Sequence, residues 1–304
     1  KWQWNINANI SYNKNQIMQL PDGNKTVVED NRYLMVGQPI NSFRLSQYNG
    51  IYLNEDMIPF DPYTGLKYKN ESGQYVQVGW ADYEDVDKDN QYVSWKDKKP
   101  IGDPNPKWVG GLNTNLSYGP WSLFVQTSFT LGRDILNTQF AKTMAPLSAQ
   151  YGADEEGVGF SGGPGANYAN PADGHWYYAE DFVARRMMVD LSRYSFWQKD
   201  GDNTNYPSRS QYMNNNNFIE RSSLFLENGS YLKLNTIMLS YNLDKLKKWG
   251  INNARLSLTA ENVAIIKSKN TLAADPSNVS PDGYYTGNGY GLPRKFTIGL
   301  MFDF

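Results

Sequence analysis

Strict alternation of apolar and polar side chains constrains this chain more than any other feature, and it is clearest at the carboxy-terminal end. Every second residue from Phe296 to Phe304 is large and apolar: Phe296, Ile298, Leu300, Phe302 and Phe304. Alternate side chains of a β-strand point to opposite faces, so this pattern predicts a strand with one apolar face. Such a face must pack on a protein core or face lipid.

The same period recurs along the chain and predicts an all-β fold. Residues 121–131 alternate most clearly, and Gly119-Pro120 joins them to a second alternating stretch at 108–118, which predicts a hairpin. Leu232 and Leu234 are out of phase with the apolar set that begins at Ile237, which predicts a bulge near residues 235–236. We expect eight strands, near 2–12, 31–37, 42–53, 107–118, 121–132, 230–243, 254–265 and 294–304, although alternation is poor in 42–53.

The connections between these strands alternate between long and short. The long ones are 13–30, 54–106, 132–229 and 267–293, and the short ones are 37–41, 119–120 and 244–253. Short periplasmic turns and long extracellular loops are typical of outer-membrane barrels, so we expect the terminal strand to run towards the periplasm. The sequence therefore predicts an antiparallel transmembrane β-barrel with long extracellular loops.

The distribution of charge agrees with this prediction. Charged residues make up 20% of the chain, yet none lies on the apolar faces of the six clearest strands. A Lys or Arg on a lipid face costs about 2–4 kcal/mol at the membrane midplane. The opposite faces are rich in amides and hydroxyls and suit a wet lumen, which we expect to be lined by Asn113, Asn115, Gln126, Ser128, Thr130, Ser257, Thr259 and Glu261. A soluble sandwich also exposes polar faces, so a secreted β-protein that binds glycans through loop aromatics stays open.

Composition excludes several classes of function. The chain has no cysteine, which excludes disulfides, Cys-based zinc sites and thiol nucleophiles. With 29 Lys+Arg against 31 Asp+Glu it has no strong field to attract nucleic acid. A third alternative, a barrel hydrolase, would depend on the single histidine, His175, and we expect no enzymatic activity. The amino-terminal Lys1-Trp-Gln-Trp-Asn-Ile begins directly in a strand pattern and is no signal peptide, so we expect the chain to be cut from a longer one.

Short motifs in a fixed order resemble the carboxy-terminal third of SusC/RagA-type TonB-dependent outer-membrane transporters. They are Asn9-Ile-Ser-Tyr-Asn-Lys-Asn15, Val36-Gly-Gln-Pro-Ile40, Tyr83-Glu-Asp-Val-Asp-Lys-Asp89, Ile101-Gly-Asp-Pro-Asn-Pro-Lys107, Gly229-Ser-Tyr-Leu-Lys-Leu-Asn235, Leu239-Ser-Tyr-Asn-Leu243, Ala260-Glu-Asn262 and Leu292-Pro-Arg-Lys-Phe-Thr-Ile-Gly-Leu300. Each motif is weak alone, but their order and spacing cover nearly the whole chain.

The resemblance implies a barrel of about 22 strands in the bacterial outer membrane, of which this chain would hold about eight. The plug domain and the TonB box, through which the TonB complex drives plug movement, would lie outside this sequence. Such transporters import oligosaccharides or peptides beneath a SusD-like surface lipoprotein. Eight strands with two free edges cannot close a wide barrel, so we expect an upstream segment or a second chain to supply the rest.

Two groups of loop residues are candidate binding sites. Trp80, Trp95, Trp176, Tyr177 and Tyr178 could stack on substrate or contact the lid, or alternatively pack the loops onto each other. Asp85, Asp87 and Asp89 occupy positions 1, 3 and 5 of a calcium-loop spacing. Asn90 and Lys96 replace the Gly and Glu of a true EF-hand, so an acidic solvated loop is the alternative to a Ca²⁺ site.

Overall fold

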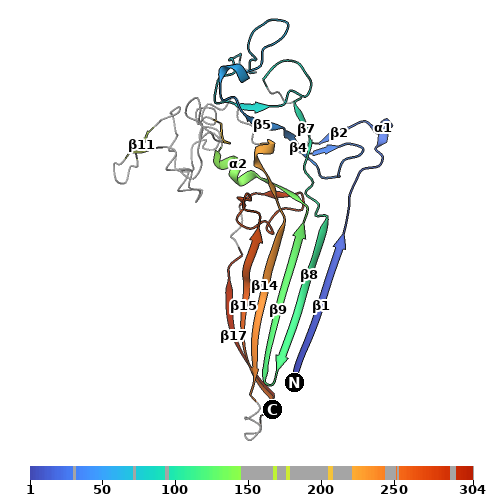
Figure 1. Cartoon of the computed structure of the whole chain (residues 1–304), viewed down its shortest axis with the longest axis vertical. Coiled ribbons are helices and arrows are strands. Elements are labelled where there is room, and N and C mark those ends of the chain that lie inside the picture. The colour runs from blue at the N-terminus through green and yellow to red at the C-terminus, as the bar shows by residue number, and fades with distance from the viewer. Residues whose placement is uncertain are drawn as a thin grey trace.

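The computed structural model describes residues 1–29, 32–70, 73–92, 96–144, 167–169, 176–178, 205–207, 221–243, 251, 253–287 and 292–303. A tall antiparallel sheet forms one end of the molecule, and a layer of loops and short strands covers its other end (Figure 1). No helix in the described part of the chain combines the length and the apolar character needed to cross a membrane.

The tall sheet contains six described strands in the order β1-β8-β9-β14-β15-β17. Their bounds are Trp2–Tyr12 (β1), Trp108–Tyr118 (β8), Trp121–Leu131 (β9), Tyr231–Asn242 (β14), Asn253–Lys267 (β15) and Lys295–Asp303 (β17). Every neighbouring pair is antiparallel, including the predicted β8–β9 hairpin. Both chain termini therefore lie at the end of the sheet away from the loop layer (Figure 1), and the predicted antiparallel all-β fold is confirmed.

Strand register separates two faces across the whole sheet. One row of paired residues is apolar apart from a threonine and runs Ile6, Thr114, Val125, Ile237, Ala260 and Phe296. The adjacent row, displaced by one residue on each strand, is polar and runs Asn7, Asn113, Gln126, Thr236, Glu261 and Lys295. Because side chains alternate along each strand, the two rows face opposite sides.

A bulge interrupts the register of β14 where the sequence changes phase. The pairing of β14 with both of its neighbours shifts between Leu234 and Thr236. The extra residue, Asn235, donates a hydrogen bond from Nδ2 to Ser128 Oγ at 2.9 Å. The bulge predicted near residues 235–236 is therefore confirmed, and it keeps the apolar residues of β14 on one side of the sheet.

Among the residues that the structure describes, four small sheets and several short helices form the loop layer. The sheets have the strand orders β2-β3-β4-β7, β5-β6, β13-β10-β16 and β11-β12. The strands are Val27–Glu29 (β2), Arg32–Leu34 (β3), Phe43–Ser46 (β4), Tyr48–Ile51 (β5), Ala81–Tyr83 (β6), Lys98–Ile101 (β7), Asp134–Asn137 (β10), Asn167–Ala169 (β11), Trp176–Tyr178 (β12), Leu226–Asn228 (β13) and Tyr284–Tyr285 (β16). The helices are Pro21–Asn24 (α1), Glu55–Met57 (η1), Thr138–Met144 (α2) and Ser223–Phe225 (η3).

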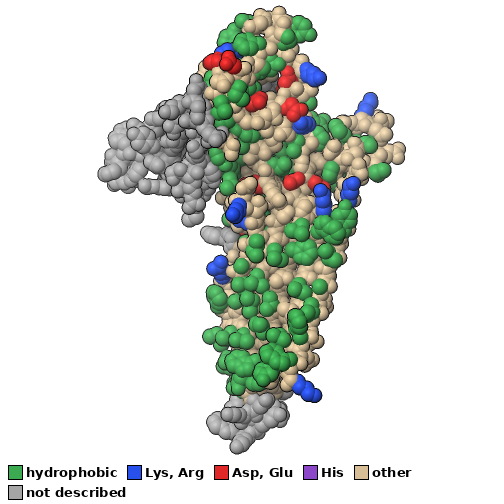
Figure 2. All heavy atoms as spheres, viewed as in Figure 1, with side chains coloured by type: hydrophobic (Ala, Val, Ile, Leu, Met, Phe, Trp, Pro, Cys, Tyr) green, Lys and Arg blue, Asp and Glu red, His purple; other side chains and the backbone are tan. Residues whose placement is uncertain are grey.

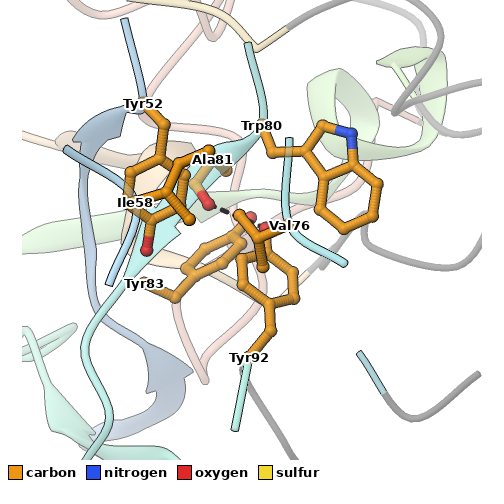
Figure 3. Close-up of a cluster of buried hydrophobic side chains, with 7 residues drawn as sticks. All are labelled: Tyr52, Ile58, Val76, Trp80, Ala81, Tyr83 and Tyr92. Carbon is orange, nitrogen blue, oxygen red and sulfur yellow. Dashed lines mark hydrogen bonds between the residues drawn. The ribbon is translucent and has the colours of Figure 1, made fainter. Parts of the chain in front are cut away.

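Small hydrophobic cores hold the loop layer together. One core joins residues distant in sequence: Phe43, Leu45, Leu136, Phe140, Ala141 and Phe225. A second consists of Tyr52, Ile58, Val76, Trp80, Ala81, Tyr83 and Tyr92, with Tyr92 Oη donating to the Ala81 carbonyl at 2.7 Å (Figure 3). The span 54–106, which looks loop-like in the sequence, is therefore partly a packed unit.

The strands expected near 31–37 and 42–53 do not belong to the tall sheet, and this part of the prediction is wrong. The chain there forms β3, β4 and β5, each of three or four residues, within the loop layer. Phe43 and Leu45 are buried from one side of β4, and Ser42 and Ser46 are buried as well. A segment buried on both faces shows little alternation, and strands this short cannot cross a membrane, which takes about 9–11 residues.

Candidate functional site

The apolar face of the tall sheet is exposed over its whole width. Leu258 in the sheet interior is 47% exposed, and Trp2 and Ile298 near the edges are 68% and 73% exposed. Figure 2 shows hydrophobic side chains over the sheet, while most acidic and basic side chains in that view lie on the loops above it. An extended exposed apolar surface of this kind marks a region that meets another protein, a ligand or a membrane.

Two polar groups in the middle of this face form hydrogen bonds within the sheet. Trp4 Nε1 donates to Thr114 Oγ1 at 2.7 Å, across the β1–β8 pair. Thr127 Oγ1 donates to the Leu112 carbonyl at 3.2 Å. Water would satisfy these groups without such bonds, whereas in hydrocarbon an unpaired polar group costs several kcal/mol. The pairing therefore suits an apolar surrounding.

Aromatic residues mark both ends of the apolar face. At the end of the sheet away from the loop layer, Trp2 stacks on Tyr118 with ring centroids 4.3 Å apart, and Trp121 meets Tyr241 edge-on at 4.7 Å. At the other end Tyr12 packs on Trp108 at 4.6 Å. Trp2 and Tyr12 are ten residues apart on β1, about 33 Å along a strand. A strand segment of this length, tilted by about 40° from the barrel axis, spans a height of about 25 Å, which is the height of the apolar band of a membrane barrel.

The opposite face carries all eight residues predicted to line a lumen. The strand register places Asn113, Asn115, Gln126, Ser128, Thr130, Ser257, Thr259 and Glu261 on this single face. Ser122 Oγ donates to Asn115 Oδ1 at 3.0 Å, and Ser257 Oγ lies 3.4 Å from the Gly299 carbonyl oxygen. The structure thus brings these residues together, while their role in a lumen stays a prediction.

Two lysines on the polar face form ion pairs. Glu261 on β15 lies opposite Lys295 on β17, with Oε2 and Nζ 3.5 Å apart. Lys233 on β14 is 8% exposed, and its Nζ lies 3.4 Å from Asp275 Oδ2 and 3.0 Å from Ser277 Oγ. Burial raises the pKa of Asp275, but hydrogen bonds from Ser277 and the Lys233 ammonium outweigh burial and hold it below its usual value. These contacts fasten the loop around residue 275 to the wall.

A hollow of about 400 Å³ opens on the polar face, between β1, β8 and β9. Asn7, Asn9, Asn113 and Gln126 line it, together with Gly111, which has no side chain. The bulged Asn235 of β14 also reaches its border. No charged or aromatic residue is among the described residues that line the hollow.

Sequence reasoning placed Asn113, Gln126 and Ser128 on this wall but missed Asn7, Asn9, Gly111 and Asn235. The amides of residues 2–12 alternate with apolar residues as regularly as those of 121–131 do, so the signal for Asn7 and Asn9 was present. Nothing in the local pattern shows that Gly111 lies between Asn9 and Ser128, because that neighbourhood depends on strand pairing.

The ring of Trp80 lies in a core of the loop layer, and its contact with substrate or a lid stays a prediction. Trp80 is 7% exposed and packs on Tyr92 with ring centroids 5.5 Å apart (Figure 3). Trp80 packs loop residues onto each other, which is the alternative role given above for these aromatic residues. Trp176, Tyr177 and Tyr178 form β12 and pair with β11, and their contact role stays a prediction. Trp95 and His175 lie outside the described residues.

Asp85, Asp87 and Asp89 do converge. Their carboxylates lie within 4.8 Å of one another. Burial raises the pKa of Asp89, opposed by a hydrogen bond from the Gln91 amide, and the charges of Asp87 and Asp85 raise it further. Lys96 Nζ lies 3.9 Å from Asp87 Oδ2 and neutralises part of the charge. Ca²⁺ binding here stays a prediction, which calorimetric titration of the metal-free protein with Ca²⁺ tests.

Comparison with known proteins is consistent across sequence and structure. No protein-family model matches the chain. TonB-dependent receptor P26 of Formosa agariphila is 25% identical over 319 residues, which are 100% of this chain and 27% of the relative. TonB-dependent receptor P3 of the same organism is 25% identical over 321 residues, or 99% of this chain and 27% of the relative. The chain thus spans about a quarter of the length of these curated relatives.

Solved structures of a RagAB peptide importer have the same fold. The open-open state matches with a TM-score of 0.62 and 20% identity, over 100% of this chain and 27% of that one. The closed-closed state matches with a TM-score of 0.62 and 19% identity, over 99% of this chain and 27% of that one. These relatives are receptors and importers, not enzymes, in agreement with the expectation of no enzymatic activity. Sequence and fold together identify the chain as similar, over its whole length, to about a quarter of a SusC/RagA-type TonB-dependent transporter.

Proposed function

We propose that this chain forms part of the barrel wall of a nutrient importer in the bacterial outer membrane. The observation that supports the proposal most is the two-faced sheet. One face is apolar, free of charge at its described positions and bounded by aromatics at both ends. The other is lined by amides and hydroxyls. Lipid outside and water inside account for both faces.

The connections give the wall a direction in this proposal. β8 and β9 are joined by the two residues 119–120, and β14 and β15 by residues 243–252. The opposite end of the sheet carries the long connections 13–107, 132–230 and 268–294. By the rule for outer-membrane barrels, the short turns face the periplasm and the loop layer faces outward.

The transported molecule and the partners belong to the proposal as well. The solved relatives are described as a peptide importer, which supports peptides, with oligosaccharides as the other class. A wall of about six strands needs further strands and a plug from the rest of the protein. A SusD-like surface lipoprotein would cover the loop layer, and the TonB complex would drive plug movement through segments outside this sequence.

Membrane extraction of the full-length protein tests the proposal directly. Cells that produce the protein are fractionated, and the outer membrane is washed with high salt and with carbonate before detergent is added. We expect the protein to stay in the membrane until detergent is present and to migrate faster on gels when unboiled, as folded barrels do. Release into buffer without detergent would overturn the proposal and favour the secreted, glycan-binding β-protein.

A further inference from the structure

One face of a small sheet in the loop layer gathers positive charge. β4 and β7 lie side by side there (Figure 1), with Arg44 opposite Pro100 and Ser46 opposite Lys98. Paired residues share a face of a sheet, as do residues two apart on one strand. Arg44, Ser46 and Lys98 therefore lie on one face. Arg221 adjoins them, because its carbonyl accepts a hydrogen bond from the Ser46 amide at 3.0 Å.

Lys98 lacks a negative partner on this face. It forms no ion pair within the described part of the chain. Burial lowers the pKa of Lys98, and the positive charges of Arg44 and Arg221 lower it further. Its neighbour Lys99, on the opposite face, instead has its Nζ 2.5 Å from Glu84 Oε2. An anion beside Lys98 would supply the counter-charge that Lys99 already has.

Two buried hydroxyl groups beside Lys98 are also unsatisfied. Ser46 and Ser222 pair through a parallel bridge, and both residues are 0% exposed. Neither Oγ atom has a hydrogen-bond partner among the described residues. The next residue, Ser223, differs, because its Oγ accepts a hydrogen bond from the Tyr48 amide at 2.9 Å. An unpartnered buried hydroxyl is unfavourable and uncommon in folded proteins, so a ligand that accepts from both serines would account for them.

The donors of this face fit a phosphate group. Each serine hydroxyl donates one hydrogen bond, and the lysine ammonium donates three. A phosphate group carries negative charge and three acceptor oxygens that point in different directions, so it can accept from hydroxyls on one side and from cations on the other. A carboxylate has two oxygens in one plane and satisfies fewer of these donors.

We propose that the hydroxyls of Ser46 and Ser222 and the ammonium of Lys98 bind a phosphate group, as free phosphate or as a phosphomonoester. Arg44 and Arg221 add positive charge around it. The two hydroxyls are covered in this structure, so the flexible side chain of Lys98 must move aside to admit the anion and then close on it. The site goes beyond the proposed function, since it needs neither a membrane nor transport.

Calorimetric titration of the full-length protein in detergent tests the site, with Lys98→Met and the matched control Lys99→Met. The probes are sodium phosphate, glycerol phosphate and sodium acetate, added at constant ionic strength in chloride. We expect Lys98→Met to weaken phosphate binding about tenfold, as the loss of a hydrogen bond from a charged group does. Lys99→Met should leave binding unchanged. Ser46→Ala should weaken phosphate binding about threefold and yet raise the urea midpoint without phosphate, because it removes an unpartnered buried hydroxyl.

The probes also separate the two sources of the phosphate group. Binding of inorganic phosphate alone assigns the free ion, and binding of glycerol phosphate as well assigns phosphate groups of larger molecules. No binding of either, equal effects of Lys98→Met and Lys99→Met, or acetate bound as tightly as phosphate would overturn the proposal. If Lys98→Met fails to fold, unchanged phosphate binding in Ser46→Ala overturns it instead. Membrane extraction does not depend on phosphate, so the proposed function stands or fails separately.

Discussion

A lysine placed on either side of the same strand should distinguish a lipid-facing wall from a soluble sheet. Leu258 and Thr259 are neighbours near the middle of β15, so they lie at nearly the same depth and point to opposite faces. Leu258 belongs to the apolar face and is 47% exposed, between Leu239 and Ile298 of the adjacent strands. Thr259 belongs to the polar face, between Met238 and Thr297.

The two environments predict very different costs for the substitution. If the apolar face meets lipid, Leu258→Lys should destabilise the folded protein by about 2–4 kcal/mol, roughly a 30- to 1,000-fold change in the folding equilibrium. If the same face meets water, a half-exposed residue should tolerate lysine within about 0.5 kcal/mol. Thr259→Lys should be mild in either case, because its face is polar and wet.

Refolding of the full-length protein from urea into phosphatidylcholine vesicles measures this difference. Tryptophan fluorescence and heat-modifiable mobility on gels report the folded fraction for wild type, Leu258→Lys and Thr259→Lys. We expect the urea concentration at which half of the protein is folded to fall strongly for Leu258→Lys and little for Thr259→Lys. Equal shifts for the two variants, or a larger one for Thr259→Lys, would refute the assignment of the faces.

Three further predictions concern packing and charge. Gly110→Val should cost about 1–3 kcal/mol, because a Cβ atom would meet the Asn9 carbonyl oxygen and lie 2.7 Å from the Phe129 ring; urea midpoints measure it. Lys233→Met should loosen the loop around residue 275 by about 2–3 kcal/mol, since the largely buried carboxylate of Asp275 keeps its hydrogen bonds from Ser277 but loses its cationic partner; hydrogen exchange of that loop measures it. Burial raises the pKa of Glu227 in the folded protein above its unfolded value near 4.5. Its contribution to stability is therefore complete at pH values below the unfolded pKa and is lost as the pH rises through the higher folded pKa. Proteolysis of the loop layer as a function of pH measures this loss.

Each of these predictions has a control and a contrary outcome. Lys295→Met removes an exposed pair with Glu261 and should cost less than about 1 kcal/mol, so an effect as large as that of Lys233→Met would contradict the burial argument. Ser117→Val, on the same strand as Gly110, is the control for Gly110→Val and should change the urea midpoint little. Glu227→Gln should remove the described fall of stability with rising pH, and an unchanged pH profile would exclude Glu227 as its source.

Much of the candidate wall could be predicted from the sequence because its signal is local. Period-2 alternation depends only on strand geometry, so the six strands of the tall sheet lie where alternation predicted strands. The same pattern assigned the eight predicted lumen residues to one face, and the change of phase near Asn235 predicted the bulge.

Tertiary structure decided what depends on partners far away in the sequence. Residues 31–37 and 42–53 form strands, but these strands are short and pair with other segments of the loop layer, and burial on both sides of residues 42–46 holds that segment there. Trp80 is part of a core because residues from 52 to 92 surround it. The hollow exists only where Gly111 of β8 lies between Asn9 of β1 and Ser128 of β9. Local periodicity assigns a side chain to a face, whereas its neighbours on that face follow from strand pairing, which no local pattern encodes.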